Sequence, residues 1–391
     1  MQVLTLDTET SRHCGNLPWY TSSFLVSLCV KFGSEMRTFV FNHKDVEYTK
    51  PNLKEIQRYF DEADIIVAHN LKFDLHWIHH LGIDTSKNRY YCTMVAEYLI
   101  NGQSRETELS LRVLSQKYNI PDKLDMVGDY WDSGYETDEI PLDVLIPYGE
   151  QDVLNCEAIY KSQIPIIVKQ RQSKLVKLRC ESLRVTQQIE ANGMKINTEL
   201  CQNMSQDYAN KINQLTETLI ETTKESLPEL RDININLSSN DHLSAILFGG
   251  IIKYDGREDT QRVLKDGTIK IGSRSAKLFI RTAGIGFVPR EGTETAKPGY
   301  YQTDVGQLTE LKAKTPTQKL FLEFISELSK MEKMKGTYCD GLLERNIGGV
   351  VHPSINETAT RTGRYSSSNP NSQNMPREGT SPVKMLFTTR Y

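Results

Sequence analysis

The sequence predicts an α/β fold for residues 1–165, a mainly helical segment at 166–345 and a polar strip at 346–391. In the first segment, short apolar runs rich in β-formers alternate with runs of helical spacing, which is typical of a sheet covered by helices. Long amphipathic patterns dominate the second segment. They are interrupted at about 249–298 by a stretch rich in Gly and Thr that indicates β-hairpins, which we expect to be accessory elements without a catalytic role.

The composition limits the classes of protein to consider. A chain of 391 residues with 38% hydrophobic and 25% charged residues is ordinary for a soluble protein of two or three domains. The net charge of −3 argues against bulk attraction to a polyanion, so any nucleic-acid contact must come from local patches. The seven cysteines are scattered without Cys-x-x-Cys spacing, which indicates reduced thiols. With no signal peptide and no apolar run long enough to span a bilayer, we expect no membrane association and a cytoplasmic location, in the host cytoplasm if the protein is viral.

The first strand ends in two carboxylates. The apolar run at residues 3–6 is followed by Asp7 and Glu9, whose side chains point to the same face of an extended segment. Burying both without a cation between them would be costly. Because hard carboxylate oxygens suit Mg²⁺ or Mn²⁺, this strand end is a candidate metal site, although the pattern alone is in most sequences a solvated strand end.

The next elements lead to a third acid. Residues 24–32 and 37–41 predict a hairpin, residues 51–60 a helix and residues 64–68 a short buried strand. A helix then follows with Asp74 in its first turns, where the helix dipole favours a carboxylate.

Histidines near this helix suggest an alternative metal. His76 and His80 stand four residues apart, a spacing found in zinc sites, but no glutamate base or third ligand is nearby. We therefore expect these histidines, and His69 before them, to have structural roles.

A late helix carries the last two candidate groups. After a helix at residues 109–118 and a loop at 120–140, Pro141 opens a helix on which Tyr148 and Asp152 lie four residues apart, hence on one face. Taken singly, these residues would be a half-buried aromatic and a solvated acid.

Together these motifs resemble the 3′–5′ proofreading exonucleases of the DEDDy type. Asp-x-Glu, Asn-x-x-Phe-Asp and Tyr-x-x-x-Asp occur in the order of that family, and the spacing resembles the proofreading domain of family A DNA polymerases. The match is especially close over residues 69–75. Cys92-Thr93 departs from the usual Asp-Thr, at a position that holds no metal in the family. The resemblance implies a ribonuclease H-like fold.

The resemblance also implies two-metal phosphodiester hydrolysis with Mg²⁺ or Mn²⁺. In that scheme Asp7 would bridge both ions, Glu9 and Asp152 would complete the first site, and Asp74 would serve the second, partly through water. Tyr148 would orient the attacking water, because a phenol with a pKa of about 10 is a poor base at neutral pH. By the same resemblance, Asn70 and Phe73 would contact the DNA.

The middle of the chain resembles the thumb of family A polymerases. The resemblance is carried by residues 189–197 and 236–248, which flank a long polar helix expected up to about residue 225. Such a helix could bridge solvent, pack against another helix or lie along DNA. The sequence from Lys335 to Tyr338 resembles a thumb-to-palm junction that approaches primer–template, so we predict DNA contacts for both residues.

Residues 362–376 resemble the segment of the family A palm that grips the primer. The stretch is almost free of apolar residues, and its amide, hydroxyl and guanidinium groups can bond phosphates and sugars without reading sequence. Tyr365 and Ser372 stand where leucines are usual. The predicted DNA contacts are Arg364, Asn371, Gln373, Asn374 and the nearby Lys384.

In the family, the catalytic palm aspartates follow after this strip, so we expect the chain to be the N-terminal part of a polymerase, without synthesis on its own. A split gene, an intron or intein, or a cut sequence would each explain this, and the layout looks phage-like. We expect a C-terminal polypeptide to complete palm and fingers, aided by an exposed apolar edge at residues 385–387. The predicted activity is a 3′–5′ exonuclease. The alternatives are a non-catalytic DNA-gripping half of a split polymerase and an exoribonuclease like RNase D.

Overall fold

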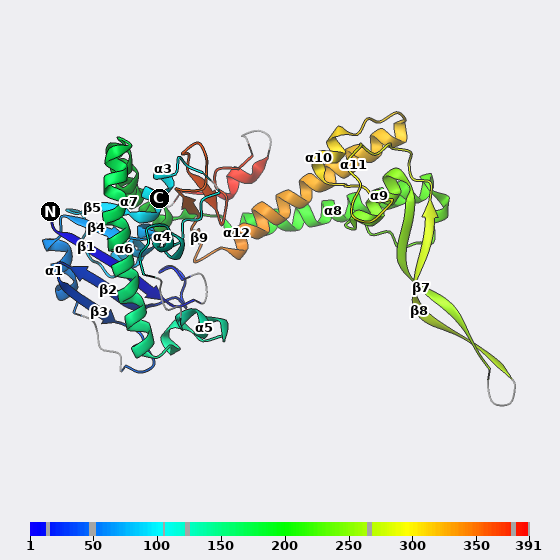
Figure 1. Ribbon diagram of the computed structural model, residues 1–391. Coiled ribbons are helices and arrows are strands. Elements are labelled where there is room, and N and C mark those ends of the chain that lie inside the picture. The colour runs from blue at the N-terminus through cyan, green and yellow to red at the C-terminus, as the bar shows by residue number, and fades with distance from the viewer. Residues whose placement is uncertain are drawn as a thin grey trace. The chain divides into compact units, whose positions relative to one another are not determined.

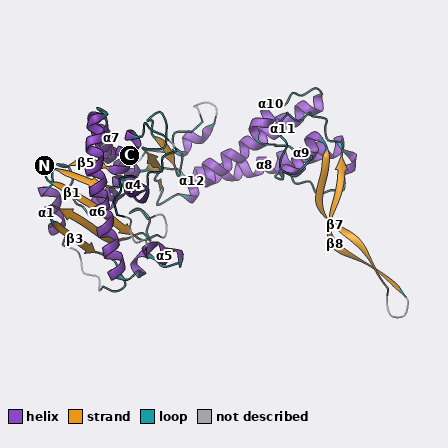
Figure 2. Cartoon of the chain, viewed as in Figure 1, coloured by secondary structure: helices purple, strands orange, loops and turns teal. Residues whose placement is uncertain are grey.

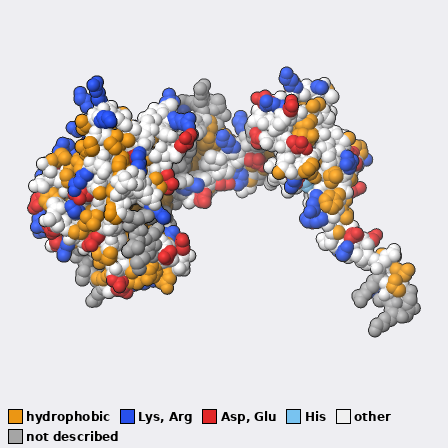
Figure 3. Space-filling model, in the orientation of Figure 1, with side chains coloured by type: hydrophobic (Ala, Val, Ile, Leu, Met, Phe, Trp, Pro, Cys, Tyr) orange, Lys and Arg blue, Asp and Glu red, His pale blue; other side chains and the backbone are white. Residues whose placement is uncertain are grey.

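The computed structural model describes residues 1–12, 16–46, 52–104, 106–121, 126–263, 268–376 and 381–389. The chain forms two compact units. Unit 1 comprises Met1–Ile196 and Arg345–Tyr391, and unit 2 comprises Asn197–Glu344. Each unit has its own hydrophobic core. On the viewed faces of both units, charged side chains of either sign are interspersed with apolar ones, in line with the small net charge (Figure 3).

Unit 1 is built on a five-stranded sheet with the order β3-β2-β1-β4-β5 (Figures 1 and 2). β1 is central, antiparallel to β2 and parallel to β4. The predicted hairpin is present as β2 and β3, and the predicted buried strand is β4. The strands are β1 (Val3–Thr10), β2 (Leu25–Phe32), β3 (Glu35–Val40), β4 (Ile65–Ala68) and β5 (Arg89–Cys92).

Seven α-helices occur among the described residues of unit 1. α2 follows β4 directly, and the long helix α6 packs on β1 and β2, so both helices bring side chains to the central strand. The helices are α1 (Leu53–Glu62), α2 (Leu71–His80), α3 (Thr93–Ile100), α4 (Leu111–Lys117), α5 (Met126–Asp132), α6 (Leu142–Lys169) and α7 (Ser173–Asn192).

The predicted loop at residues 120–140 is wrong in part, because α5 lies within it. Val127 is fully buried and packs with Val26, Ile140 and Leu145 in a small separate cluster. This packing stabilises a short helix that the glycines and acids of the stretch argue against, since tertiary contacts provide most of the stability of short helices.

The strip after residue 345 belongs to unit 1. β9 (Val350–Val351) pairs with β6 (Met194–Lys195), and β10 (Ser354–Asn356) pairs with β11 (Ser366–Ser368). A 3₁₀ turn at Pro382–Leu386 follows. The predicted exposed apolar edge is correct for Met385, which is 67% exposed, but wrong for Leu386, which is fully buried. The chain after the turn bridges to the buried Ile196 through Phe387, which turns Leu386 away from solvent.

Unit 2 is mainly helical. The predicted long helix is α8 (Thr198–Ser226), and it packs against α11 (Pro316–Lys333) rather than standing alone in solvent. α9 (Asn240–Phe248) is capped by Ser239, as the Ser/Asn pattern indicates. The remaining elements are α10 (Val305–Glu310), a π-helical turn at Met334–Asp340 and α12 (Gly341–Glu344).

The β-rich stretch of unit 2 is one long hairpin of β7 (Gly250–Val263) and β8 (Ile269–Thr282) (Figure 2). Its base packs into the core through Ile252, while Val263 and Ile269, at the far end, are 68% and 59% exposed.

The compact units do not coincide with the three predicted segments. Residue 165 lies inside α6, and unit 1 continues to Ile196 before the chain enters unit 2. The assignment of residues 1–165, 166–345 and 346–391 to exonuclease, thumb and palm therefore stays a prediction. Within the described ranges, no helix combines the length and apolar character needed to cross a membrane.

Candidate active site

Three of the predicted acids lie together at the end of the central strand. Asp7 and Glu9 come from β1 and Asp152 from α6, and one carboxylate oxygen of each lies within 4.8 Å of the others. Alternation along β1 turns Asp7 and Glu9 to one side of the strand, where α6 packs. A group of three hard oxygen donors at this spacing suits a divalent cation such as Mg²⁺ or Mn²⁺.

Tyr148 lies one helical turn before Asp152 on α6, as the spacing predicts. Its ring is half-buried and packs edge-on against Trp131 at a centroid distance of 6.0 Å. The contact with Trp131 supports the Tyr148 ring from one side. Because Tyr148 and Asp152 lie four residues apart, their side chains share one face of α6.

Asp74 is not a member of that group of three. It lies on α2, is 2% exposed and accepts a hydrogen bond from Thr8 Oγ1 at 2.7 Å. Its Oδ2 is buried without a hydrogen-bond partner, and burial raises the pKa of this carboxyl group to about 7. A buried carboxylate oxygen that lacks a donor is costly unless a cation compensates it, so the donor set fits a second cation near Asp74.

Sequence reasoning missed Thr8, which stands between the two acids of β1. Its side chain points away from those of its neighbours, toward α2, where it donates to Asp74. Strand alternation was the signal available for this contact, but the partner on α2 could be found only from the structure.

Groups around the site are not competing metal ligands. Cys29 pairs with Asp7 in the β1–β2 register, and burial raises the pKa of its thiol to about 12, an effect that nearby Asp7, Glu150 and Glu9 increase. The structural role expected for the histidines agrees with their contacts. His69 Nδ1 lies 2.8 Å from Thr93 Oγ1, and His76 Nε2 lies 2.8 Å from Glu190 Oε2.

The predicted DNA-binding residues lie in both units. In unit 1, Asn70 is exposed and Phe73 half-buried beside Asp74. In unit 2, Lys335 Nζ lies 2.6 Å from Asp340 Oδ2, and Tyr338 is 8% exposed within the π-helical turn. The DNA contacts of all these residues stay predictions. The exposed ones in the C-terminal strip of unit 1 are Arg364, Asn371, Gln373, Asn374 and Lys384.

Two family models match the chain. The model described as 3′–5′ exonuclease matches residues 1–162, and the model described as DNA polymerase family A matches residues 275–390. The chain is 28% identical over 319 residues to DNA polymerase I of Synechocystis sp., covering 79% of this chain and 27% of that protein. It is 25% identical over 352 residues to the DNA polymerase of Escherichia phage T5, covering 83% of this chain and 35% of that protein.

The fold also resembles a solved structure, the POL domain of Pol1 from M. smegmatis in complex with DNA primer-template and dNTP. The TM-score is 0.66 at 16% identity, over 98% of this chain and 54% of that one. The chain thus spans about a third or less of the length of the two curated relatives.

Proposed function

Since the chain belongs to family A of the DNA polymerases, with a 3′–5′ exonuclease domain of ribonuclease H-like fold and the start of a polymerase domain, we propose that it removes nucleotides from DNA 3′ ends. The observation that carries this proposal is the group formed by Asp7, Glu9 and Asp152, with Asp74 held by Thr8. The substrate is single-stranded or frayed DNA, as proofreading requires.

The residues take the following roles. Asp7, Glu9 and Asp152 would hold one divalent ion, and Asp74 together with Asp7 would hold a second. When bound, two such ions would neutralise charge at the phosphate and lower the pKa of the attacking water. Tyr148 would form a hydrogen bond with that water and so orient it, and the Trp131 ring keeps the phenol in place. Mg²⁺ or Mn²⁺ is the metal that carboxylate oxygens favour.

The strip at residues 346–391 serves to hold primer–template. Its exposed Arg364 can pair with a phosphate, and the exposed amides near it can bond sugars and bases. We further propose that a second polypeptide supplies the remaining palm and fingers for synthesis, and that the protein acts in the cytoplasm. The T5 relative is named as a DNA polymerase, which supports a role in DNA synthesis but bears on neither the second polypeptide nor the location.

The test uses end-labelled oligonucleotides with the purified chain. With Mg²⁺, single-stranded DNA should shorten from its 3′ end, and EDTA should stop the reaction. Asp7→Ala, purified in parallel, controls for contaminating nuclease and should show no more than background. Equal shortening by wild type and Asp7→Ala would refute the assignment of the acids.

The same assay separates the alternatives. An RNA oligonucleotide of matching sequence should be degraded far more slowly than DNA. RNA degraded as fast as DNA favours an exoribonuclease like RNase D. Binding of primer–template without any degradation favours a non-catalytic DNA-gripping half.

A further inference from the structure

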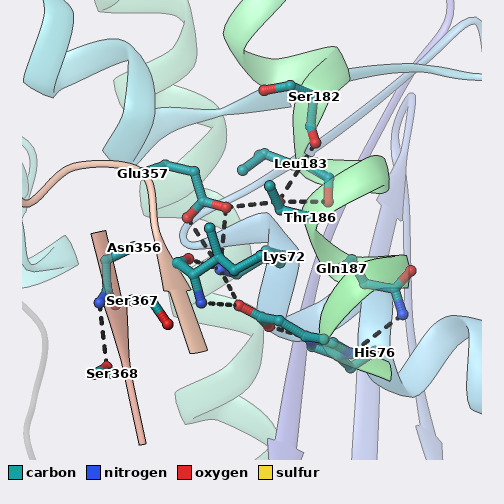
Figure 4. A network of polar contacts seen from close by, with 12 residues as sticks. Lys72, His76, Ser182, Leu183, Thr186, Gln187, Asn356, Glu357, Ser367 and Ser368 are labelled. Carbon is teal, nitrogen blue, oxygen red and sulfur yellow. Dashed lines mark hydrogen bonds and ion pairs between the residues drawn. The ribbon is translucent and has the colours of Figure 1, made fainter. Parts of the chain in front are cut away.

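A buried ionic network joins α2 to α7 and to the C-terminal strip of unit 1 (Figure 4). Lys72 Nζ lies 2.7 Å from Glu190 Oε1 and 3.1 Å from Glu357 Oε2, and it also donates to the carbonyl oxygen of Ile355. The three charged side chains are 13%, 4% and 5% exposed. One ammonium group therefore bridges two carboxylates in a place that water hardly reaches.

Further hydrogen bonds fix both carboxylates. Glu357 Oε1 accepts from Thr186 Oγ1 at 2.6 Å, and Glu190 Oε2 lies 2.8 Å from His76 Nε2. Although burial raises it, the pKa of Glu190 is held below its usual value by the bond from His76 and the ammonium of Lys72. Glu190 therefore stays ionised, and a buried charge of this kind is strongly destabilising if its partner is removed.

The spacing on α2 sets this network opposite Asp74. At 3.6 residues per turn, Asp74 lies about 200° around the helix from Lys72, whereas His76 lies only about 40° from it. One face of α2 thus holds Lys72 and His76 against the acids, and the other holds Asp74 against Thr8 of β1. The helix is fixed between these two sets of contacts.

We propose that Lys72 is a positioning residue that makes the placement of Asp74 depend on the docking of residues 354–357. This inference rests on the proposed exonuclease function and deepens it. Residues 354–356 are strand β10, and Arg364 lies in the connection between β10 and β11. The strip that we propose to hold primer–template is thereby attached, through Glu357 and Lys72, to the helix that carries a metal-binding acid of the exonuclease site.

Two variants test the proposal. Lys72→Met keeps the length of the side chain and removes its charge, and Glu357→Gln keeps the shape of the acid and removes one charge from the strip. Lys117→Met is the matched control, because Lys117 pairs with the fully buried Glu97 elsewhere in unit 1. All three should lower the melting temperature, since each removes a partner of a largely buried charged side chain.

The metal dependence distinguishes positioning from a merely structural role. Changing a residue that orients a metal ligand typically weakens metal binding by about tenfold or more. We expect such a loss of Mn²⁺ affinity by calorimetry in Lys72→Met and Glu357→Gln, with a parallel rise in the Mg²⁺ concentration that gives half-maximal exonuclease rate. Lys117→Met should bind Mn²⁺ like the wild type. Wild-type affinity in both folded test variants would overturn the proposal.

Replacement variants and one further measurement keep the outcome decisive. If Lys72→Met does not fold, Glu357→Gln and Thr186→Val, which removes one bond to Glu357, replace it. If the wild type binds Mn²⁺ but degrades no DNA, the proposed function fails while the Mn²⁺ affinities still decide this inference. If the wild type binds no Mn²⁺, hydrogen exchange of residues 71–75 decides: faster exchange in Glu357→Gln than in Lys117→Met supports positioning, and equal exchange contradicts it.

Discussion

Replacing Asp7 by Asn should abolish exonuclease activity and yet make the metal-free protein more stable. Each pair of unit charges at the 4.8 Å limit of the Asp7, Glu9 and Asp152 group repels by about 3.5 kcal/mol at an effective dielectric constant of about 20. Solvent screening reduces such interactions strongly, so we expect the free energy of unfolding of the metal-free protein to rise by about 1 kcal/mol. That gain corresponds to a rise of about 2–4 °C in the melting temperature of unit 1.

The activity should move in the opposite direction. Loss of several kcal/mol of charge stabilisation at the phosphate lowers the rate by about a thousandfold or more. The assays are thermal melting in EDTA and in Mn²⁺, and shortening of labelled single-stranded DNA. Wild type should melt at a higher temperature when Mn²⁺ is added, because binding stabilises the folded state, and Asp7→Asn should gain much less.

The control is Asp143→Asn, which removes an exposed acid from the first turn of α6. This variant should keep full activity. Its free energy of unfolding should fall by only a few tenths of a kcal/mol, because the favourable interaction of Asp143 with the helix dipole is lost. A lower melting temperature of Asp7→Asn in EDTA would refute the reasoning, because the acids would then not repel one another. So would activity close to that of wild type.

Three other changes have defined outcomes. Tyr148→Phe should slow DNA shortening by about tenfold to a hundredfold with little change in KM, since one orienting hydrogen bond is lost while the ring still packs on Trp131. No change in rate would make Tyr148 a packing aromatic only. Arg364→Ala should weaken primer–template binding and reduce the salt slope by about one, as measured by fluorescence anisotropy, and an unchanged slope would exclude a phosphate contact. Replacing residues 258–274 by Asn-Gly should leave the exonuclease rate and the melting temperature within error of wild type, because the described residues of the distal strands pair with one another across the hairpin. A loss of activity would give the hairpin a catalytic role.

The sequence predicted the parts of the site that local pattern encodes. Acids at i and i+2 of a strand lie on one face of that strand, and an aromatic residue and an acid at i and i+4 of a helix lie on one face of that helix. Both placements hold whatever the rest of the fold is. The hydrogen bond from Thr8 to Asp74, and the place of Asp74 outside the group of three acids, depend on how α2 packs on β1. The order of the motifs in the sequence does not encode that packing.

The features that the sequence did not predict also depend on packing between distant parts of the chain. α5 forms because Val127 finds a pocket made by distant residues, and Leu386 is buried by a turn that bridges back to Ile196. Nothing near Glu190 or Glu357 in the sequence indicates that both meet Lys72. A buried network of this kind is specified by contacts between residues more than a hundred positions apart.

The β6–β9 ladder has a consequence for the order of folding. Met194 pairs with Val351 and Lys195 with Val350, so the ladder closes a loop that contains the whole of residues 197–344. Closing that loop while it is still a random chain costs about 4 kcal/mol of entropy before any contact is gained. Early folding of unit 2 would replace most of this loop by a compact body. Strands β9 to β11 of unit 1 follow that loop in the sequence, so we expect unit 1 to complete its structure after unit 2 has folded.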